Sequence, residues 1–281
     1  MSLEETASSP APAAQSVAPQ QRRQPPSILR ETVTEIQHYT DKLFSFRTTR
    51  TPSFRFESGQ FAMIGLEVDG RPLLRAYSMS SAYYDDYLEF FSIKVPNGPL
   101  PSRLQHIKVG DTILINAKPT GTLLLGNLKP GKRLILMCTG TGFAPFGSVL
   151  RDPATYDHYE SVVVAYGCRN VAELQYATQT VVAVRDHELL AEHVGDKLEY
   201  YATVTREPYH RQGRVTDLLF SGKMFHDLNQ APLDKETDRI MICGNPYMTA
   251  DLRKSLSERG FGEGSSGEPG EFVVEKAFVD R

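Results

Sequence analysis

The pattern of hydrophobic and polar positions changes partway along the chain. Before about residue 125, short alternating or apolar runs are separated by Gly and Pro, which predicts many short strands and few long helices. The expected strands cover residues 32–38, 43–48, 61–68, 74–80, 87–95 and 112–117, with one short helix at 102–107. Short strands with turn residues between them are typical of a closed or nearly closed antiparallel β-barrel.

After Pro130, apolar strands alternate with helical patterns. The expected strands are residues 133–138, 161–166, 198–205, 239–243 and 272–278, and the expected helices are 144–151, 171–184, 216–219 and 246–259. This alternation predicts an open α/β sheet. We therefore expect an N-terminal antiparallel β-barrel over residues 28–129 and a C-terminal α/β doubly wound parallel sheet over residues 130–281.

Composition excludes several classes of protein. Residues 1–27 are rich in Ala, Pro, Ser and Gln and lack the apolar segment of a secretory signal, which predicts a disordered lead. No apolar run approaches the ~20 residues of a membrane span, so we expect none. The formal net charge of −3 gives no bulk electrostatic reason to expect nucleic acid.

The cysteines and histidines favour neither a metal centre nor a hydrolase. Cys138, Cys168 and Cys243 form no C-x-x-C pair, and the histidines are scattered. Zinc ribbons, dithiol redox sites and iron–sulfur clusters need closer spacing or more thiolates. We expect no metal, and the sparse cysteines fit a protein of the reducing cytoplasm.

Residues 75–80 carry chemistry that suits a flavin nucleotide. Arg75 offers a rigid fork of donors for a pyrophosphate. Tyr77 faces the same side of the strand, where its ring could stack on an isoalloxazine. Ser78 could present its hydroxyl to the flavin edge. The alternative is an ordinary strand with one exposed Arg and a packed Tyr.

Two further segments suit nucleotide phosphates. Residues 98–104 follow a strand and open a helix that contains Ser102, so backbone N–H groups there are placed to bind phosphate. Residues 140–145 follow another strand and resemble a dinucleotide-binding turn, with Thr141 and Gly142 at its centre and Pro145 in place of the third Gly.

Arginines near the strand ends of the second half bear on the choice of nucleotide. Arg169 follows the second parallel strand, Thr205 and Arg206 follow the third, and Arg214 lies close behind. Several arginines at strand ends suit the 2′-phosphate of NADP. The alternative is that they are solvated surface side chains, which is the usual fate of Arg.

These motifs together resemble a known family. R-A-Y-S at 75–78, F-S-I-K-V-P-N-G-P-L-P-S-R-L at 91–104 and K-P-T-G-T-L at 118–123 are similar to the FAD domain of bacterial ferredoxin–NADP(+) reductases, although Pro101 stands where Thr is common. The resemblance implies that FAD is bound by Arg75, Ala76, Tyr77, Ser78, Phe91, Ser92, Ile93, Lys94, Val95, Leu100 and Ser102.

The second half resembles the same family. Residues 168–176 and 205–217 are similar to its NADP-phosphate segments, which implies that Thr141, Gly142, Arg169, Thr205, Arg206 and Arg214 bind NADP(H). Cys243 would lie near the hydride path, the alternative being a buried strand-end Cys.

The chain end resembles the family as well. The resemblance implies that Ala277, Phe278 and Val279 return to the flavin, with Phe278 against the ring face that the nicotinamide must occupy. Only Asp280 and Arg281 follow. We thus expect Ser78, Cys243 and Phe278 at the reacting centre.

The function implied by the resemblance is FAD-dependent electron transfer between NADP(H) and ferredoxin or flavodoxin. We also expect the protein to be a cytoplasmic monomer. One alternative is an NAD(P)H-dependent reductase of the cytochrome b5 reductase type, against which the arginines and Phe278 argue. A second is a non-catalytic FAD-binding module that senses redox state. It would bind FAD but would not oxidise NADPH.

Overall fold

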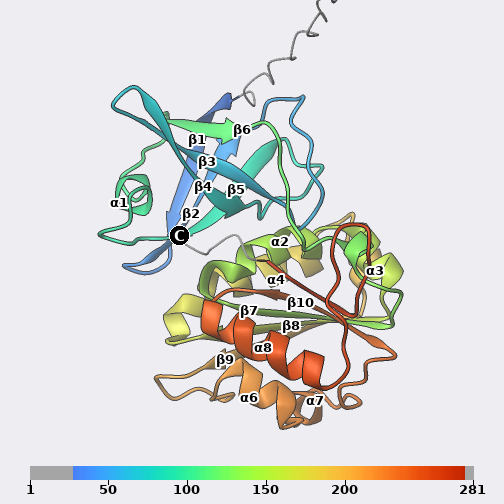
Figure 1. Ribbon diagram of the computed structural model, residues 1–281. Coiled ribbons are helices and arrows are strands. Elements are labelled where there is room, and N and C mark those ends of the chain that lie inside the picture. The colour runs from blue at the N-terminus through green and yellow to red at the C-terminus, as the bar shows by residue number, and fades with distance from the viewer. Residues whose placement is uncertain (1–27, 276–281) are drawn as a thin grey trace, which may run out of the picture.

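Two β-sheets organise the chain, as Figure 1 shows for the computed structural model. The structure describes residues 28–275. One sheet is antiparallel and belongs to the N-terminal half, and the other is parallel and belongs to the C-terminal half. The expected fold class is thereby confirmed.

The N-terminal sheet has six strands in the order β4-β3-β6-β1-β2-β5, with every neighbouring pair antiparallel. Its strands are β1 Ile28–His38, β2 Leu43–Thr49, β3 Phe61–Val68, β4 Arg71–Ser78, β5 Tyr87–Ile93 and β6 Thr112–Asn116. The edges β4 and β5 meet through a bridge between Met79 and Phe90, and Ser80 N donates to Glu89 O at 2.8 Å. The barrel is therefore closed directly after the strand that carries Arg75 and Ser78.

The C-terminal sheet has five parallel strands in the order β11-β10-β7-β8-β9. Their bounds are β7 Arg133–Thr139, β8 Ser161–Cys168, β9 Leu198–Val204, β10 Asp238–Cys243 and β11 Phe272–Val274. From β7 the chain builds outward through β8 and β9, and then crosses back to β10 on the other side. In such a sheet, ligands bind outside the carboxyl ends of the strands at this switch point, here between β7 and β10.

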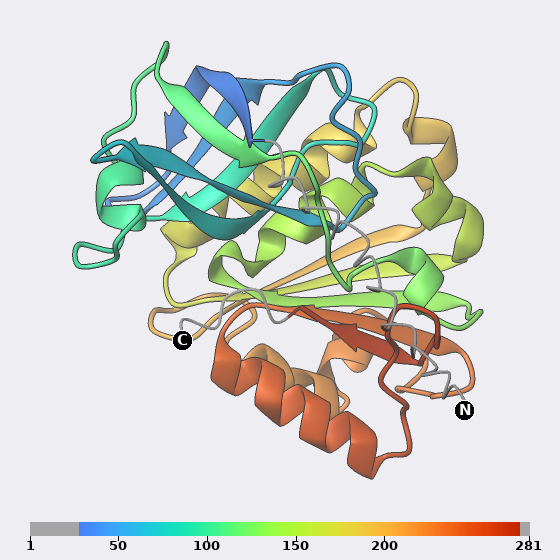
Figure 2. The ribbon, with the colours of Figure 1, turned by 45° about the horizontal axis from the view of Figure 1, so that its top comes forward.

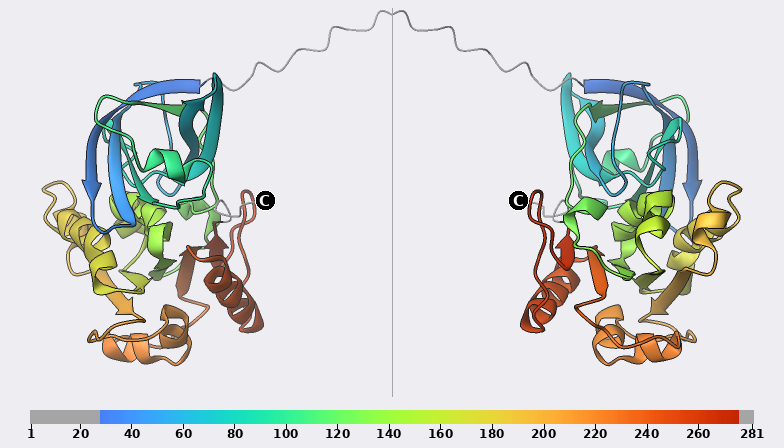
Figure 3. Two further views of the ribbon diagram at one scale, coloured as in Figure 1. Left: turned by 90° about the vertical axis from the view of Figure 1, so that its left-hand side faces the viewer. Right: turned by 90° about the vertical axis from the view of Figure 1, so that its right-hand side faces the viewer.

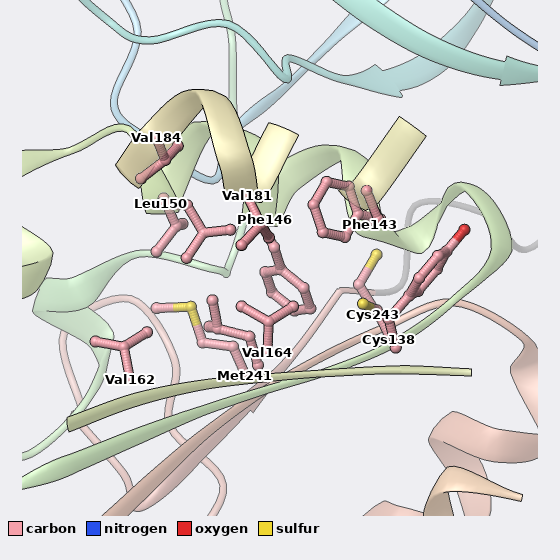
Figure 4. Packing of buried hydrophobic residues seen from close by; sticks show 14 of the residues in the cluster. Cys138, Phe143, Phe146, Leu150, Val162, Val164, Val181, Val184, Met241 and Cys243 are labelled. Carbon is pink, nitrogen blue, oxygen red and sulfur yellow. The ribbon is translucent and has the colours of Figure 1, made fainter. Parts of the chain in front are cut away.

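Helices cover both faces of the parallel sheet (Figure 2). The face toward the barrel carries α2 Ala144–Leu150, α3 Pro153–His158, α4 Gln175–Arg185 and α5 Ala191–Val194, preceded by the short turns η2 Gly140–Phe143 and η3 Val171–Leu174. The opposite face carries α6 Val215–Phe220, α7 Lys223–Asp227 and α8 Pro246–Glu258. Alternate residues of each strand serve the two faces, and Figure 4 shows Val162, Val164 and Met241 beneath the helices nearest the barrel.

Some elements differ from the sequence-based expectation. The predicted helix 171–184 is divided into the 3₁₀ turn η3 and the helix α4, and α1 is the short helix Pro101–Leu104. Helices α3, α5 and α7 were not predicted, because segments of four to six residues carry too little periodicity to be recognised. The strand expected at 272–278 is described only as Phe272–Val274.

The barrel rests on the layer formed by α2 and α4 (Figures 1 and 3). Leu43 and Phe91 of the barrel belong to the same apolar cluster as Phe143 and Phe146 of the α/β half. One continuous core therefore crosses from one half to the other. Within residues 28–275, no helix has both the length and the apolar character needed to span a membrane.

Candidate functional site

Two turns interlock at the switch point of the parallel sheet. A Cβ atom on Gly142 would lie 2.4 Å from the carbonyl oxygen of Cys243. A Cβ on Gly244, whose φ is +139°, would lie 2.6 Å from Thr139 Oγ1, which accepts a hydrogen bond from Asn245 N at 3.0 Å. These backbones approach so closely that only glycine fits at either position.

The Cys243 side chain is buried next to this turn, on the helix-covered face of the sheet that is nearer the barrel (Figure 4). Burial, and secondarily the nearby Glu275, raises the pKa of its thiol well above the usual value. A protonated thiol is a poor nucleophile. The environment therefore does not favour covalent chemistry at Cys243.

The end of β4 presents the residues predicted for the flavin. Arg75 is half-buried, and within residues 28–275 its guanidinium has no acidic partner and donates only to Leu74 O. Tyr77 is also half-buried, and its hydroxyl lies 3.3 Å from Ser92 Oγ. Ser78 is 3% exposed, and its Oγ has no hydrogen-bond partner in the described structure.

The predicted β5 residues divide between two surroundings. Ser92 lies beside Tyr77, whereas the Phe91 ring lies in the apolar cluster of the α/β half. Ile93 and Val95 are exposed, and the amide of the half-buried Lys94 donates to Lys42 O. Ala76 is half-buried between Arg75 and Tyr77 on β4.

The segment predicted to bind pyrophosphate is a tight loop before α1. Leu100 is fully buried in the barrel core, so only its main chain can face a ligand. The amide of Ser102 donates to Gly98 O at 3.1 Å, while its side chain is half-buried. Within this short helix, the hydroxyl is therefore better placed than the amide to contact phosphate.

The arginines predicted for NADP gather beyond the ends of β8 and β9. Arg206 N donates to Arg169 O at 2.9 Å, and Thr205 Oγ1 donates to Cys168 O, so the two strand ends are joined. The following loop folds back, because Gly213 N donates to Val204 O, and this brings Arg214 to the same edge.

The side chains of these arginines are exposed. Within residues 28–275, Arg169 and Arg206 form no ion pair, and Arg214 lies 3.5 Å from Asp251. Exposed guanidinium groups gathered at one edge are suited to bind a phosphate dianion.

The last described residues approach the barrel. Thr122 Oγ1 donates to Val274 O at 2.7 Å, and Thr122 N donates to Glu275 Oε2 at 3.3 Å. Sequence analysis did not single out Glu275, which is 7% exposed. Ala277, Phe278 and Val279 lie outside the described residues.

Sequence analysis also did not identify the polar contacts between the barrel and the α/β half. Tyr176 of α4 and Arg151, just after α2, both hydrogen bond to Ser80, and Tyr176 also bonds to Glu89. No local motif marks these residues, because the partners are far apart in the chain. Among residues 28–275, no group of three or more His, Cys, Asp and Glu side chains is placed to hold a metal ion.

The geometry suits a flat nucleotide bound between the two halves. A buried hydroxyl without a partner costs free energy unless a ligand supplies one. Ser78 has such a hydroxyl among the described residues, on the same strand as Arg75 and Tyr77. These residues fit the FAD expected from the sequence, and β5 beside them contacts the η2 turn at the switch point.

Comparisons with known proteins agree with this geometry. Residues 31–124 match the model of the oxidoreductase FAD-binding domain, and residues 136–254 match that of the oxidoreductase NAD-binding domain. A solved ferredoxin NADP+ reductase from Neisseria gonorrhoeae with bound FAD and NADP is similar in structure. It has a TM-score of 0.80 and 30% identity and covers 89% of this chain and 99% of its own.

Two curated relatives are closer in sequence. The ferredoxin–NADP reductase A of Sorangium cellulosum is 56% identical over 90% of this chain and 91% of its own length. The flavodoxin/ferredoxin–NADP reductase of Rhodobacter capsulatus is 54% identical over 89% of this chain and 93% of its own. The resemblance seen in the motifs is thereby confirmed, and the chain belongs to the ferredoxin–NADP reductase family.

Proposed function

We propose that this protein transfers electrons between NADP(H) and ferredoxin or flavodoxin by means of bound FAD. The single observation that carries the proposal is the buried Ser78 hydroxyl, which has no hydrogen-bond partner among residues 28–275 and lies on the same strand as Arg75 and Tyr77. Family membership supports ferredoxin and flavodoxin as the electron partners, because the relatives are named as reductases of these proteins.

The barrel residues would hold the flavin nucleotide. Arg75 donates to the pyrophosphate, Ser102 adds a hydroxyl, and Tyr77 packs its ring on the cofactor. Ala76, Leu100 and the β5 strand, including Phe91, Ser92, Ile93, Lys94 and Val95, line the remaining length. Because the Phe91 ring packs into the apolar cluster, its contribution comes from the main chain. Bound FAD supplies a ring that takes up hydride from NADPH and releases electrons one at a time.

The parallel-sheet residues would hold NADP(H) as substrate. Thr141 and Gly142 give the dinucleotide close access to the backbone, while Arg169, Arg206 and Arg214 neutralise the 2′-phosphate with help from Thr205. The exposure of the three guanidinium groups supports this assignment, as does the lack of an ion pair at Arg169 and Arg206 among residues 28–275. NADH lacks that phosphate, so these residues also produce the preference for NADPH.

Two further roles follow from the family. Cys243 would border the nicotinamide as a neutral thiol, which its buried position supports. Ala277, Phe278 and Val279 would return to the flavin, with Phe278 moving aside for the nicotinamide. Ser78, Cys243 and Phe278 then surround the reacting atoms.

We extend the proposal to the organisation of the chain. Residues 28–129 would form the FAD-binding domain and residues 130–281 the NADP(H)-binding domain, in a protein that acts as a monomer. The thiols of Cys138, Cys168 and Cys243 are all free, which supports a cytoplasmic location.

The test is a visible spectrum of the purified protein followed by anaerobic titration with NADPH and NADH. We expect a bound flavin, bleaching by NADPH at much lower concentration than by NADH, and onward reduction of ferredoxin or flavodoxin. A protein that takes up no flavin would contradict the proposal. Bound FAD that NADPH does not reduce would indicate the non-catalytic module, and equal use of both nucleotides would indicate the cytochrome b5 reductase type.

A further inference from the structure

Tyr176 is a side chain of α4 that packs against the barrel. Its ring stacks on Phe91 of β5, with ring centroids 4.1 Å apart and planes inclined by 19°. It also meets Tyr39 edge-on, at a centroid distance of 5.3 Å. On its own side it contacts Phe143, the last residue of the η2 turn. Tyr176 therefore touches the barrel and the dinucleotide turn at once.

The hydroxyl of Tyr176 connects to the strand that carries the flavin motif. It lies 2.6 Å from Ser80 Oγ and 2.6 Å from Glu89 Oε1, which share its one proton. Ser80 is two residues after Ser78, and both side chains are buried. Only Met79 separates Ser80 from Ser78, the last residue of β4, so the contacts of Ser80 constrain the end of that strand.

Other contacts fix Ser80 from the same direction. Arg151 donates to Ser80 O and also to Gly147 O, 3.1 Å away. A Cβ on Gly147 would lie 2.2 Å from Ser80 Oγ, so α2 approaches Ser80 as closely as a glycine permits. Glu89 is held in turn by Arg47, whose Nε donates to Oε2 at 3.0 Å. We call Ser80, Glu89, Gly147, Arg151 and Tyr176 the domain junction.

We propose that Tyr176 is a positioning residue for hydride transfer, which sets the separation between the Arg75–Ser78 strand and the dinucleotide turn. Hydride transfer depends on the placement of two rings, and an error of about 1 Å can slow such a step by about 100-fold. The domain junction joins the two segments that would hold those rings, and within it Tyr176 contacts both the barrel and Phe143 of the dinucleotide turn. The inference rests on the proposed function and adds a residue to it.

A purely structural role would give different results. Tyr156 is a matched control, because its ring is equally buried and its hydroxyl donates to Leu150 O at 2.8 Å within the α/β half. Tyr156→Phe removes one buried hydroxyl contact, and Tyr176→Phe removes the contacts to Ser80 and Glu89. Both should lower thermal stability, Tyr176→Phe by the larger amount, so stability does not decide between the roles.

The deciding measurements are made on the purified protein and on protein reconstituted with FAD. In Tyr176→Phe we expect hydrogen exchange to speed up at the Ser80 amide, which donates to Glu89 O. The dissociation constant of FAD, measured by quenching of flavin fluorescence, should rise about tenfold. The rate of flavin reduction at saturating NADPH should fall about tenfold, while the apparent affinity for NADPH changes less than twofold. Tyr156→Phe should leave all of these within twofold.

Ser80→Ala tests the same contact from the barrel and should change the same quantities in the same direction. The inference is overturned if Tyr176→Phe and Tyr156→Phe behave alike, or if exchange at Ser80 rises while FAD affinity and reduction rate do not change. Failure of the proposed function is distinguishable, because it appears in the unmodified protein as absence of flavin uptake or of reduction by NADPH.

Discussion

The two ends of the candidate nucleotide site are built in opposite ways. At the barrel end, the Ser78 hydroxyl is buried without a partner among the described residues, and Arg75 is half-buried. At the arginine end, Arg169, Arg206 and Arg214 are exposed to solvent. In a buried site each polar contact with a ligand is strong, and each unmade contact raises the free energy of the folded protein. An exposed charge needs no partner to be stable, but water and salt screen its attraction for a ligand.

This difference suggests a division of labour. A buried, preorganised site suits a cofactor that stays bound through many turnovers. An exposed cationic edge suits a substrate that must arrive and leave in each cycle, because charge there attracts the dianion without enclosing it. The predictions below test whether the two ends differ in this way, from the largest expected effect to the smallest.

Gly244→Ala should damage both ends together, because the turn lies at the switch point between them. The added Cβ would lie 2.6 Å from Thr139 Oγ1 at a φ of +139°. We expect a loss of about 3 kcal/mol or more in the free energy of unfolding, measured by urea denaturation. Gly70→Ala is the control for positive φ without crowding, since nothing lies within 4 Å of its Cβ position. If the two variants lose equal free energy of unfolding, the loss in Gly244→Ala comes from the positive φ and not from contact of the added Cβ with Thr139.

Arg75→Ala should weaken the barrel end alone. Loss of a charge-assisted contact to the pyrophosphate should raise the dissociation constant of FAD by about 10- to 100-fold. Fluorescence titration of flavin against the protein freed of cofactor measures it. The exposed Arg30, which pairs with Glu67, supplies the control Arg30→Ala. Unchanged FAD affinity in Arg75→Ala would remove Arg75 from the flavin site.

Arg206→Ala should weaken the arginine end alone. We expect the KM for NADPH to rise about tenfold while kcat/KM for NADH stays the same, because only NADPH carries the 2′-phosphate. The loss should shrink as salt is added, since the contact is exposed. An equal loss with both nucleotides would indicate that Arg206 does not bind this phosphate.

Ser78→Ala should give effects of opposite sign with and without FAD. Without flavin, removing a buried hydroxyl that lacks a partner should stabilise the protein by about 1 kcal/mol in urea unfolding. With flavin, the same change should weaken FAD binding several-fold. Arg206→Ala should leave the flavin-free stability unchanged. If Ser78→Ala destabilises the flavin-free protein, the Ser78 hydroxyl already has a hydrogen-bond partner there, and it does not depend on FAD to supply one.

Asp251→Asn should produce the smallest effect. The Asp251 carboxylate lies 3.5 Å from Arg214, with both side chains 59% exposed, so it competes weakly with a phosphate for the guanidinium. Removing its charge should lower the KM for NADPH by about twofold, in keeping with the small energy of surface ion pairs. A larger KM would mean that Asp251 orients Arg214 productively.

Much of the fold and the candidate site was accessible from the sequence because the signals are local. The change from short, turn-bounded strands to alternating strands and helices separated the two sheets, and Gly142 and Gly244 stand where the chain turns directly after a strand. Short helices such as α3 and α7 were not recognised, because four to six residues hold too little periodicity.

By itself, the sequence determined the chemical groups available at each strand end, since the order of residues along a strand also sets which side each faces. Only the tertiary structure decided that Tyr176, which lies in a segment resembling a phosphate-binding motif, contacts Ser80, 96 residues away. It also decided that the Phe91 ring packs against Tyr176 and that the Ser78 hydroxyl is buried without a partner among residues 28–275. Burial and long-range pairing depend on which surfaces meet when two folded halves come together, and no local pattern encodes that meeting.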